Sequence, residues 1–319
     1  MFAKIFLIIL MLPAMAWAWQ PTKPVNVVVG FAPGSLNETT FRVVAQQVQR
    51  MHPNFTYRIE LKPGADSVIA HNALAAAVPD GHTVGVTSIL SLYITNGIWQ
   101  RESMKFQTDS LVPVTTLGAV PMAIVANVNS KINTPAELNR VLKETTTPVN
   151  FAVGAGAHRL TWELIMDRAR GNRDLVKFTQ YNGPVQATTA IASDAGIEFG
   201  VVPVNFAMPL IQAGKLKLIG VSGNKKTAGV DPYRVGNQVL EGTQGEFTLT
   251  LPPNTPSDIA KWYHNAFTAA LQTAEVQKFL ADNYLVIEAT HTSTAGLVKR
   301  TQELQALWLP LAPRLIANK

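Results

Sequence analysis

The segment Val25-Asn-Val-Val-Val-Gly30-Phe-Ala-Pro-Gly-Ser35 decides the fold. Residues that favour a buried strand run into a loop of glycine and proline, and apolar residues at helical spacing follow, at Phe41, Val44, Val48 and Met51. A strand, a glycine turn and a helix N-terminus together form an anion site, because unpaired backbone N–H groups and the helix dipole point toward one place. The segment therefore predicts an α/β unit that holds a small acid.

Residues 1–18 have the layout of a secretion signal. Lys4 precedes the apolar residues 5–12, and Ala16-Trp-Ala18 supplies the small residues of a cleavage site. The apolar stretch is too short to span a bilayer, which disfavours the alternative of a retained membrane anchor. We expect cleavage after Ala18 and a periplasmic product that starts at Trp19.

Composition excludes several classes of protein. The 319 residues include no cysteine, which excludes disulfides, thiol catalysis and cysteine-ligated zinc. The formal charge is +6, but the basic residues form no dense block; the nearest to one is Lys225-Lys226. Nucleic-acid-binding proteins gather such residues on one face or arm, so we expect no nucleic-acid partner.

Strand and helix patterns alternate along the chain, which predicts mostly parallel sheets covered by helices on both faces. Further strands are expected at residues 57–61, 83–87, 121–127, 150–153, 197–202 and 217–221. Further helices are expected at residues 68–77, 256–273, 274–283 and 294–309. Another helix is expected to begin at Thr134-Pro-Ala-Glu137, where Thr134 and Glu137 can form a capping box around Pro135.

A second glycine loop repeats the arrangement of the first. The strand at 150–153 enters Gly154-Ala-Gly156-Ala-His158-Arg159, and a helix begins near Leu160. We expect two α/β domains, the first made of residues 19–120 plus 226–319 and the second of residues 121–225. Two such domains joined by crossover strands form a cleft that closes around a ligand.

Six segments occur in an order that spans nearly the whole chain after residue 18. They are Trp19-Gln-Pro21, residues 24–34, Lys62-Pro-Gly-Ala65, Val78-Pro-Asp-Gly-His-Thr83, Ile211-Gln-Ala-Gly-Lys-Leu216 and Leu251-Pro-Pro-Asn-Thr-Pro256. Together they resemble the extracytoplasmic solute-binding proteins of tripartite tricarboxylate transporters, the Bug or TctC-like family. The resemblance implies a type II periplasmic-binding-protein fold with the ligand cleft between its domains. It also implies a carboxylate ligand, held largely by backbone amides, small hydroxyls and water, and membrane transporter subunits as partners.

Ligand contacts are expected on loops of both domains and at the end of the strand at 83–87. The candidate residues are Phe31, Ala32, Pro33, Gly34, Ser35, Leu36, Asn37, Ser88, Ala155, Gly156, Ala157, His158, Arg159, Tyr181 and Asn205. Departures from the family pattern leave the fold assignment intact and affect the ligand. Ser35 replaces a usual glycine, and Asp66-Ser67 stands where Gly-Gly is common.

Each polar candidate has two interpretations. Ser35 either contacts the ligand or caps the helix that follows it. Arg159 either binds a ligand carboxylate through two parallel hydrogen bonds or faces solvent on the first helical turn. His158, Tyr181 and Asn205 either contact the ligand or serve the loops in which they lie.

Motifs of common enzymes are missing from the sequence. It contains no Gly-x-Ser-x-Gly, His-Glu-x-x-His or Walker segment, and its six histidines show no metal-ligand spacing. We expect a monomeric binding protein with no catalytic residues, metal or cofactor. Three alternatives stay open: a receptor for a membrane sensor kinase, a binder of amino acids or other zwitterions, to which Glu38 and Asp66 point, and an exported hydrolase.

Overall fold

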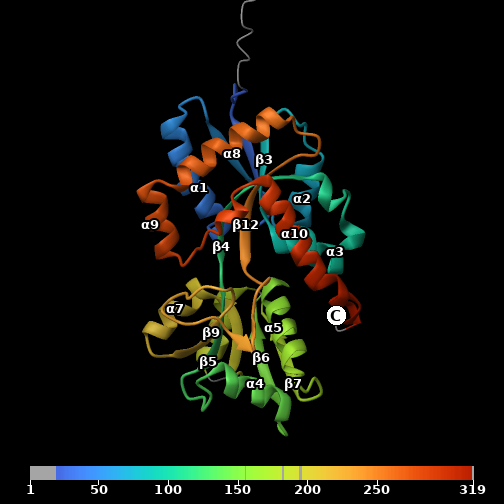
Figure 1. Cartoon of the computed structure of the whole chain (residues 1–319), viewed down its shortest axis with the longest axis vertical. Coiled ribbons are helices and arrows are strands. Elements are labelled where there is room, and N and C mark those ends of the chain that lie inside the picture. Colours follow the sequence, from blue (N-terminus) through green and yellow to red (C-terminus); the bar gives the residue numbers. More distant parts are fainter. Residues whose placement is uncertain (1–18, 155, 182, 194–195, 318–319) are drawn as a thin grey trace, which may run out of the picture.

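The segment quoted above forms the centre of the first of two sheets. In the computed structural model, which describes residues 19–154, 156–181, 183–193 and 196–317, β1 (Val25–Val29) pairs in parallel with β2 (Tyr57–Leu61) and β3 (Thr83–Ser88). Beyond β3 lie β12 (Gly245–Leu251), antiparallel to it, and β4 (Val112–Val120). This sheet, in the order β2-β1-β3-β12-β4, and the helices that cover it are called the first lobe (Figure 1).

The second lobe is built on a sheet of the same design. β6 (Val149–Val153) pairs in parallel with β7 (Val176–Gln180) and β8 (Phe199–Pro203), while β5 (Met122–Asn127) runs antiparallel to β8 and to β9 (Leu216–Val221). The order is β7-β6-β8-β5-β9. Each sheet therefore has the expected parallel core, but the strands through which the chain passes between the lobes make both sheets mixed.

Helices flank both sheets. Those of the first lobe are α1 (Leu36–Met51), α2 (Val68–Ala75), α3 (Asn96–Trp99), α8 (Ser257–Leu271), α9 (Ala274–Asp282), α10 (Thr294–Trp308) and α11 (Ala312–Ala317). Those of the second lobe are α4 (Pro135–Glu144), α5 (Gly156–Ala169), α6 (Pro184–Ala192) and α7 (Val204–Gln212).

Shorter elements complete the fold. The helical turns are η1 (Ala65–Ser67), η2 (Ser91–Thr95), η3 (Arg101–Ser103), η4 (Thr108–Ser110), η5 (Ala289–His291) and η6 (Leu309–Leu311), and a small hairpin joins β10 (Arg234–Val235) to β11 (Gln238–Val239). No helix in the described ranges is long and apolar enough to cross a bilayer. The predicted leader, residues 1–18, lies outside those ranges.

Local sequence signals account for several of these elements. The capping box that opens α4 is present: Glu137 N–H donates to Thr134 Oγ1 at 3.2 Å, and the Glu137 carboxylate accepts from Thr134 N–H at 3.1 Å. In the first lobe, Phe41 of α1 and Phe267 of α8 are fully buried and stack with their ring centroids 5.9 Å apart. Burial of each such side chain contributes about 2–3 kcal/mol, which stabilises the packing of α1 against α8.

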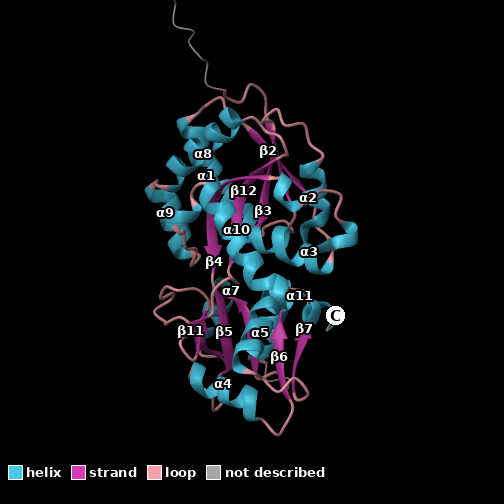
Figure 2. Cartoon of the chain, turned by 45° about the vertical axis from the view of Figure 1, so that its right-hand side comes forward, coloured by secondary structure: helices cyan, strands magenta, loops and turns pink. Residues whose placement is uncertain are grey.

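The chain crosses between the lobes where β4 leads into β5 and where β12 begins. Before β12, Tyr233 N–H donates to Val221 O at 2.7 Å, and Asn139 donates to Arg234 O at 2.9 Å, so this segment packs on the second sheet. The limits of the two domains stay a prediction, and these contacts favour a second domain that extends past residue 225 to the start of β12. At the C-terminus, α11 lies beside α5 of the second lobe (Figure 2).

Candidate functional site

The pairing of the strands turns the carboxyl edges of both sheets toward the junction of the lobes. Ser88, the last residue of β3, is paired with Phe247, close to the point where β12 enters from the second lobe. Pro203, the last residue of β8, is paired with Met122, the first residue of β5, which enters from the first lobe. Since ligands of α/β sheets bind beyond the carboxyl ends of parallel strands, the loops at these two edges form one candidate site.

The loop between β1 and α1 is held by an acid of its own helix. Gly34 has a φ of +75°, a conformation that glycine adopts at low cost, and its N–H donates to Glu38 Oε2 at 2.8 Å. Burial of the Glu38 carboxyl raises its pKa, but hydrogen bonds from Arg42 and Gly34 more than offset this and hold the pKa below its usual value. The Gly34 N–H is thus already paired and offers little to an anion.

Three predicted contacts carry buried polar atoms without a hydrogen-bond partner in the part of the chain that is described. They are Ser35 Oγ, Asn37 Nδ2 and Asn205 Oδ1. The Ser35 side chain makes no capping hydrogen bond to the described residues of α1, so the capping alternative is not observed. A buried polar group without a partner costs about 1–3 kcal/mol, and a polar ligand or water in this site would remove that cost.

The turn η1 brings an acid to the same edge of the first sheet. Ala65, Asp66 and Ser67 all have positive φ, of 47°, 50° and 73°. Such angles suit glycine, so Asp66 and Ser67 stand where a Gly-Gly pair would adopt the backbone at lower cost. Ser67 Oγ donates to Gly30 O at 3.1 Å, and a Cβ atom on Gly30 would lie only 2.5 Å from that of Ser67. The turn is therefore fastened to the loop after β1.

Asp66 is connected to the end of β3 through the turn η2. Its carboxylate accepts hydrogen bonds from Thr95 Oγ1 and, at 3.4 Å, from Ser91 Oγ. The backbone N–H of Ser91 in turn donates to Ser88 Oγ at 3.4 Å. The predicted contact Ser88 and the acid Asp66 thus belong to one cluster, and η2 contacts α5 of the second lobe.

In the second lobe, His158 holds the glycine loop. Its Nδ1 accepts a hydrogen bond from Gly154 N–H at 3.1 Å, and a Cβ atom on Gly154 would lie 2.4 Å from that nitrogen. Burial lowers the pKa of His158 to about 4, so the ring is neutral at pH 7 and Nδ1 is free of a proton. Ala155 lies outside the described residues, and Gly156 and Ala157 are described only as the first turn of α5.

Arg159 is buried rather than solvent-facing, with 7% of its surface exposed. Its guanidinium lies over the rings of Trp99, at 4.9 Å, and Phe178, at 5.0 Å, and its Nε is 3.7 Å from Glu163 Oε1. Burial lowers its pKa, and the charge of Glu163 opposes that shift. Because Trp99 belongs to α3, this stack joins the two lobes. An ionic clamp on the ligand stays a prediction for Arg159.

The other predicted residues lie at the expected edges. Tyr181 directly follows β7, where its N–H donates to Val153 O at 2.8 Å, and Asn205 lies in the first turn of α7, directly after β8. The sequence did not indicate Trp99 or Thr95 as part of this region. Nothing in the local pattern marks them, because their partners, Arg159 and Asp66, lie far from them along the chain.

Comparison with known proteins identifies the family. The sequence model described as "Tripartite tricarboxylate transporter family receptor" (TctC) matches residues 40–311. The chain belongs to this family. This TctC-family protein is 23% identical over 289 residues to a UPF0065 protein of Bordetella pertussis, with 89% of this chain and 86% of the relative covered. It is 25% identical to the protein BugT of the same organism, with 87% and 86% covered.

Solved structures confirm the predicted two-domain periplasmic-binding-protein fold. MatC from Rhodopseudomonas palustris, solved with bound malate, has a TM-score of 0.74 at 20% identity, with 92% of this chain and 100% of that chain covered. R. palustris Rpa4515, solved with adipate, has a TM-score of 0.76 at 19% identity, with 92% and 97% covered. The periplasmic binding protein BugD has a TM-score of 0.74 at 19% identity, with 92% and 98% covered. The family is one of solute-binding receptors.

Proposed function

We propose that this protein binds a small carboxylate between its lobes in the periplasm and delivers it to the membrane subunits of a tripartite tricarboxylate-type transporter. The observation that carries the proposal is the convergence of both carboxyl edges on one junction, where Ser35, Asn37 and Asn205 hold unpaired buried polar atoms. Malate and adipate, bound by two proteins of the same fold, are both dicarboxylates, which supports the class of ligand.

The binding mechanism follows from the ends of the helices. The N-termini of α1 and α5 carry partial positive charge, and each begins at a predicted ligand loop. In the first lobe, Ser35 Oγ and Asn37 Nδ2 would donate to one carboxylate, because the nearby Gly34 N–H is taken by Glu38. A ligand shifts the lobes toward closure only if it binds the closed state more tightly, so it must contact both lobes.

Other parts of the proposal rest on the sequence. We propose that residues 1–18 direct export and are removed after Ala18, that the product is a monomer, and that it performs no catalysis. The remaining predicted contacts in the first loop, Phe31, Ala32, Pro33 and Leu36, would line the ligand with backbone and apolar surface.

A thermal-shift screen of residues 19–319 tests the proposal. Malate, succinate, adipate, citrate, benzoate, aspartate and glutamate would each be added to the wild type and to Ser35→Ala and Asn37→Ala variants. A ligand that binds only the folded protein raises the melting temperature. We expect a shift with at least one of these acids and about fivefold weaker binding in each variant, the effect of a hydrogen bond of about 1 kcal/mol.

Ser257→Ala supplies a control for the loss of a serine hydroxyl, because Ser257 is exposed and is the first residue of α8. It should bind the acid as the wild type does. A shift of the melting temperature that is unchanged in both site variants would place the carboxylate elsewhere. If none of these acids shifts the melting temperature of the wild type, the proposed class of ligand is contradicted.

A further inference from the structure

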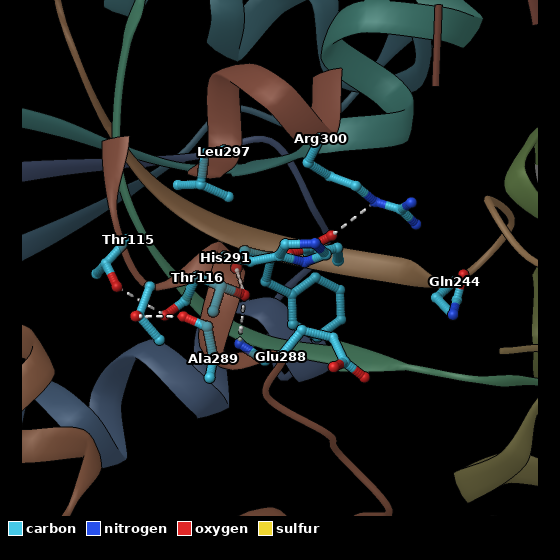
Figure 3. Close-up of polar contacts among 12 residues, drawn as sticks. Thr115, Thr116, Gln244, Glu288, Ala289, His291, Leu297 and Arg300 are labelled. Atoms are coloured by element: carbon cyan, nitrogen blue, oxygen red, sulfur yellow. Dashed lines mark hydrogen bonds and ion pairs between the residues drawn. The ribbon is translucent and has the colours of Figure 1, made fainter. Parts of the chain in front are cut away.

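The buried glutamates of this protein are paired with cations. Among the described residues, the pairs are Glu38 with Arg42 at 2.6 Å, Glu163 with Arg173 at 2.8 Å, and Glu246 with His291 at 2.9 Å and Arg300 at 3.7 Å. Figure 3 shows His291 and Arg300 of the last group, which both pair with Glu246. Such pairing is expected, because a carboxylate removed from water is costly unless a positive charge or several hydrogen bonds compensate it.

Asp66, whose side chain is half-buried, departs from this pattern. No Lys, Arg or His nitrogen of the described chain forms an ion pair with its carboxylate, which accepts only the neutral hydroxyls of Ser91 and Thr95. Burial raises its pKa above the usual value, and the two hydroxyl hydrogen bonds oppose that shift. An ionised carboxylate has about four acceptor sites, so two hydroxyl donors leave part of its capacity unused.

A role as a helix cap does not account for this carboxylate. Asp66 precedes α2, where an acid could accept from backbone N–H groups, but both of its oxygens bond to side chains of η2. The cluster also lies at the proposed binding site. Ser67 fastens η1 to the loop after β1, and Ser91 bonds to Ser88 at the end of β3.

We propose that Asp66 makes this protein selective for a ligand that carries an ammonium group beside its carboxylate, as an amino acid does. The inference rests on the proposed function of the same cleft. Donors of the Ser35 loop receive the carboxylate of the ligand, and Asp66 receives its ammonium group. The ligand then brings the cation that the chain itself does not provide, whereas a simple acid brings a second negative charge close to Asp66 and is repelled.

Matched pairs of ligands test this selectivity directly. Succinate and aspartate differ only by the ammonium group, as do glutarate and glutamate, and propionate and alanine. Titration calorimetry at pH 7.5 would compare both members of each pair on the wild type. We expect the amino member of at least one pair to bind at least tenfold more tightly, which corresponds to about 1.4 kcal/mol.

Two variants connect the preference to Asp66. Asp66→Asn keeps the shape of the side chain. Asp66→Gly suits the φ of +50° at this position, so it preserves the turn even if the asparagine variant disturbs it. Both should lose the preference and bind the simple acid as well as the wild type does, or better. Asp109→Asn, at an exposed acid of η4, is the control and should keep the preference.

The outcomes separate this inference from the proposed function. If the wild type binds simple acids as tightly as their amino counterparts, the inference is wrong and the carboxylate function stands. If the wild type prefers the amino member but both variants do too, another group recognises the ammonium and the role of Asp66 is refuted. If no member of any pair binds, this inference and the carboxylate function fail together.

Discussion

Two buried histidines should make the stability of this protein fall between pH 7 and pH 5. His71 and His158 are almost fully buried, and burial lowers the pKa of each to about 4. In each ring Nδ1 accepts a hydrogen bond, from Asn96 Nδ2 at 2.9 Å and from Gly154 N–H at 3.1 Å. Protonation at Nδ1 would break these bonds, so both rings must stay neutral in the folded state.

The sign and size of the effect follow from the two pKa values. An unfolded histidine has a pKa of about 6.5, so below that pH the unfolded chain binds protons that the folded chain does not. The contribution of these histidines to the free energy of unfolding is therefore fully present above about pH 6.5 and decreases as the pH falls toward 4. From pH 7 to pH 5 each histidine lowers the free energy of unfolding by about 2 kcal/mol, and the two together by about 4 kcal/mol. A typical domain has about 5–15 kcal/mol in total.

Urea unfolding followed by circular dichroism at pH 7, 6 and 5 measures this difference. His71→Gln and His158→Gln remove the titrating group and keep an acceptor, so each should reduce the loss between pH 7 and pH 5 by about 2 kcal/mol. His52→Gln, at a half-exposed position after α1, controls for the removal of a histidine as such. If both variants lose as much stability as the wild type over this range, the reasoning is refuted.

Two further predictions concern the contacts of the second-lobe loop. Trp99→Leu removes the ring that Arg159 contacts across the lobes, so it should favour an open form; small-angle scattering should show a larger radius of gyration, and an unchanged radius would contradict an interlobe role. Gly154→Ala places a Cβ atom against His158 Nδ1 and should cost about 1–3 kcal/mol in urea unfolding. Gly34→Ala is the control: φ is +75° there but the space is open, so it should lower the free energy of unfolding by only about 1 kcal/mol. Equal losses in the two variants would argue against a clash at Gly154.

The sequence predicted the alternation of strands and helices but missed three strands of the two sheets, β4, β7 and β12. The reason is visible in β12, where Thr248 and Thr250 alternate with apolar residues in the pattern of a half-exposed strand. Both threonines are buried, because their hydroxyls each lie 2.8 Å from Thr87 Oγ1 of the neighbouring strand β3. Polar side chains that form hydrogen bonds with a neighbouring strand give the same alternating sequence as side chains that face water, so one segment alone cannot distinguish the two cases.

The places of the candidate residues in the fold were predictable from the sequence, but their side-chain contacts were less so. Loops that follow parallel strands must lie at the carboxyl edge, so the places of Ser35 and His158 followed from the strands alone. The partners of each side chain depend on tertiary packing. Arg159 was expected to meet a ligand or solvent, but its contacts include Trp99, which lies in the other lobe and is 60 residues away along the chain.

These contacts change how specificity can arise in this fold. The charge of Arg159 is already opposed by Glu163 and its guanidinium is stacked on two rings, so recognition of a carboxylate depends more on the donors of the loops. Such donors bind any carboxylate and discriminate poorly among acids. Discrimination then requires a fixed charge nearby, and the turn η1 provides a place for one, because its left-handed backbone, here occupied by aspartate, also suits glycine. A single substitution at Asp66 can therefore change which charge the cleft accepts while the fold stays the same.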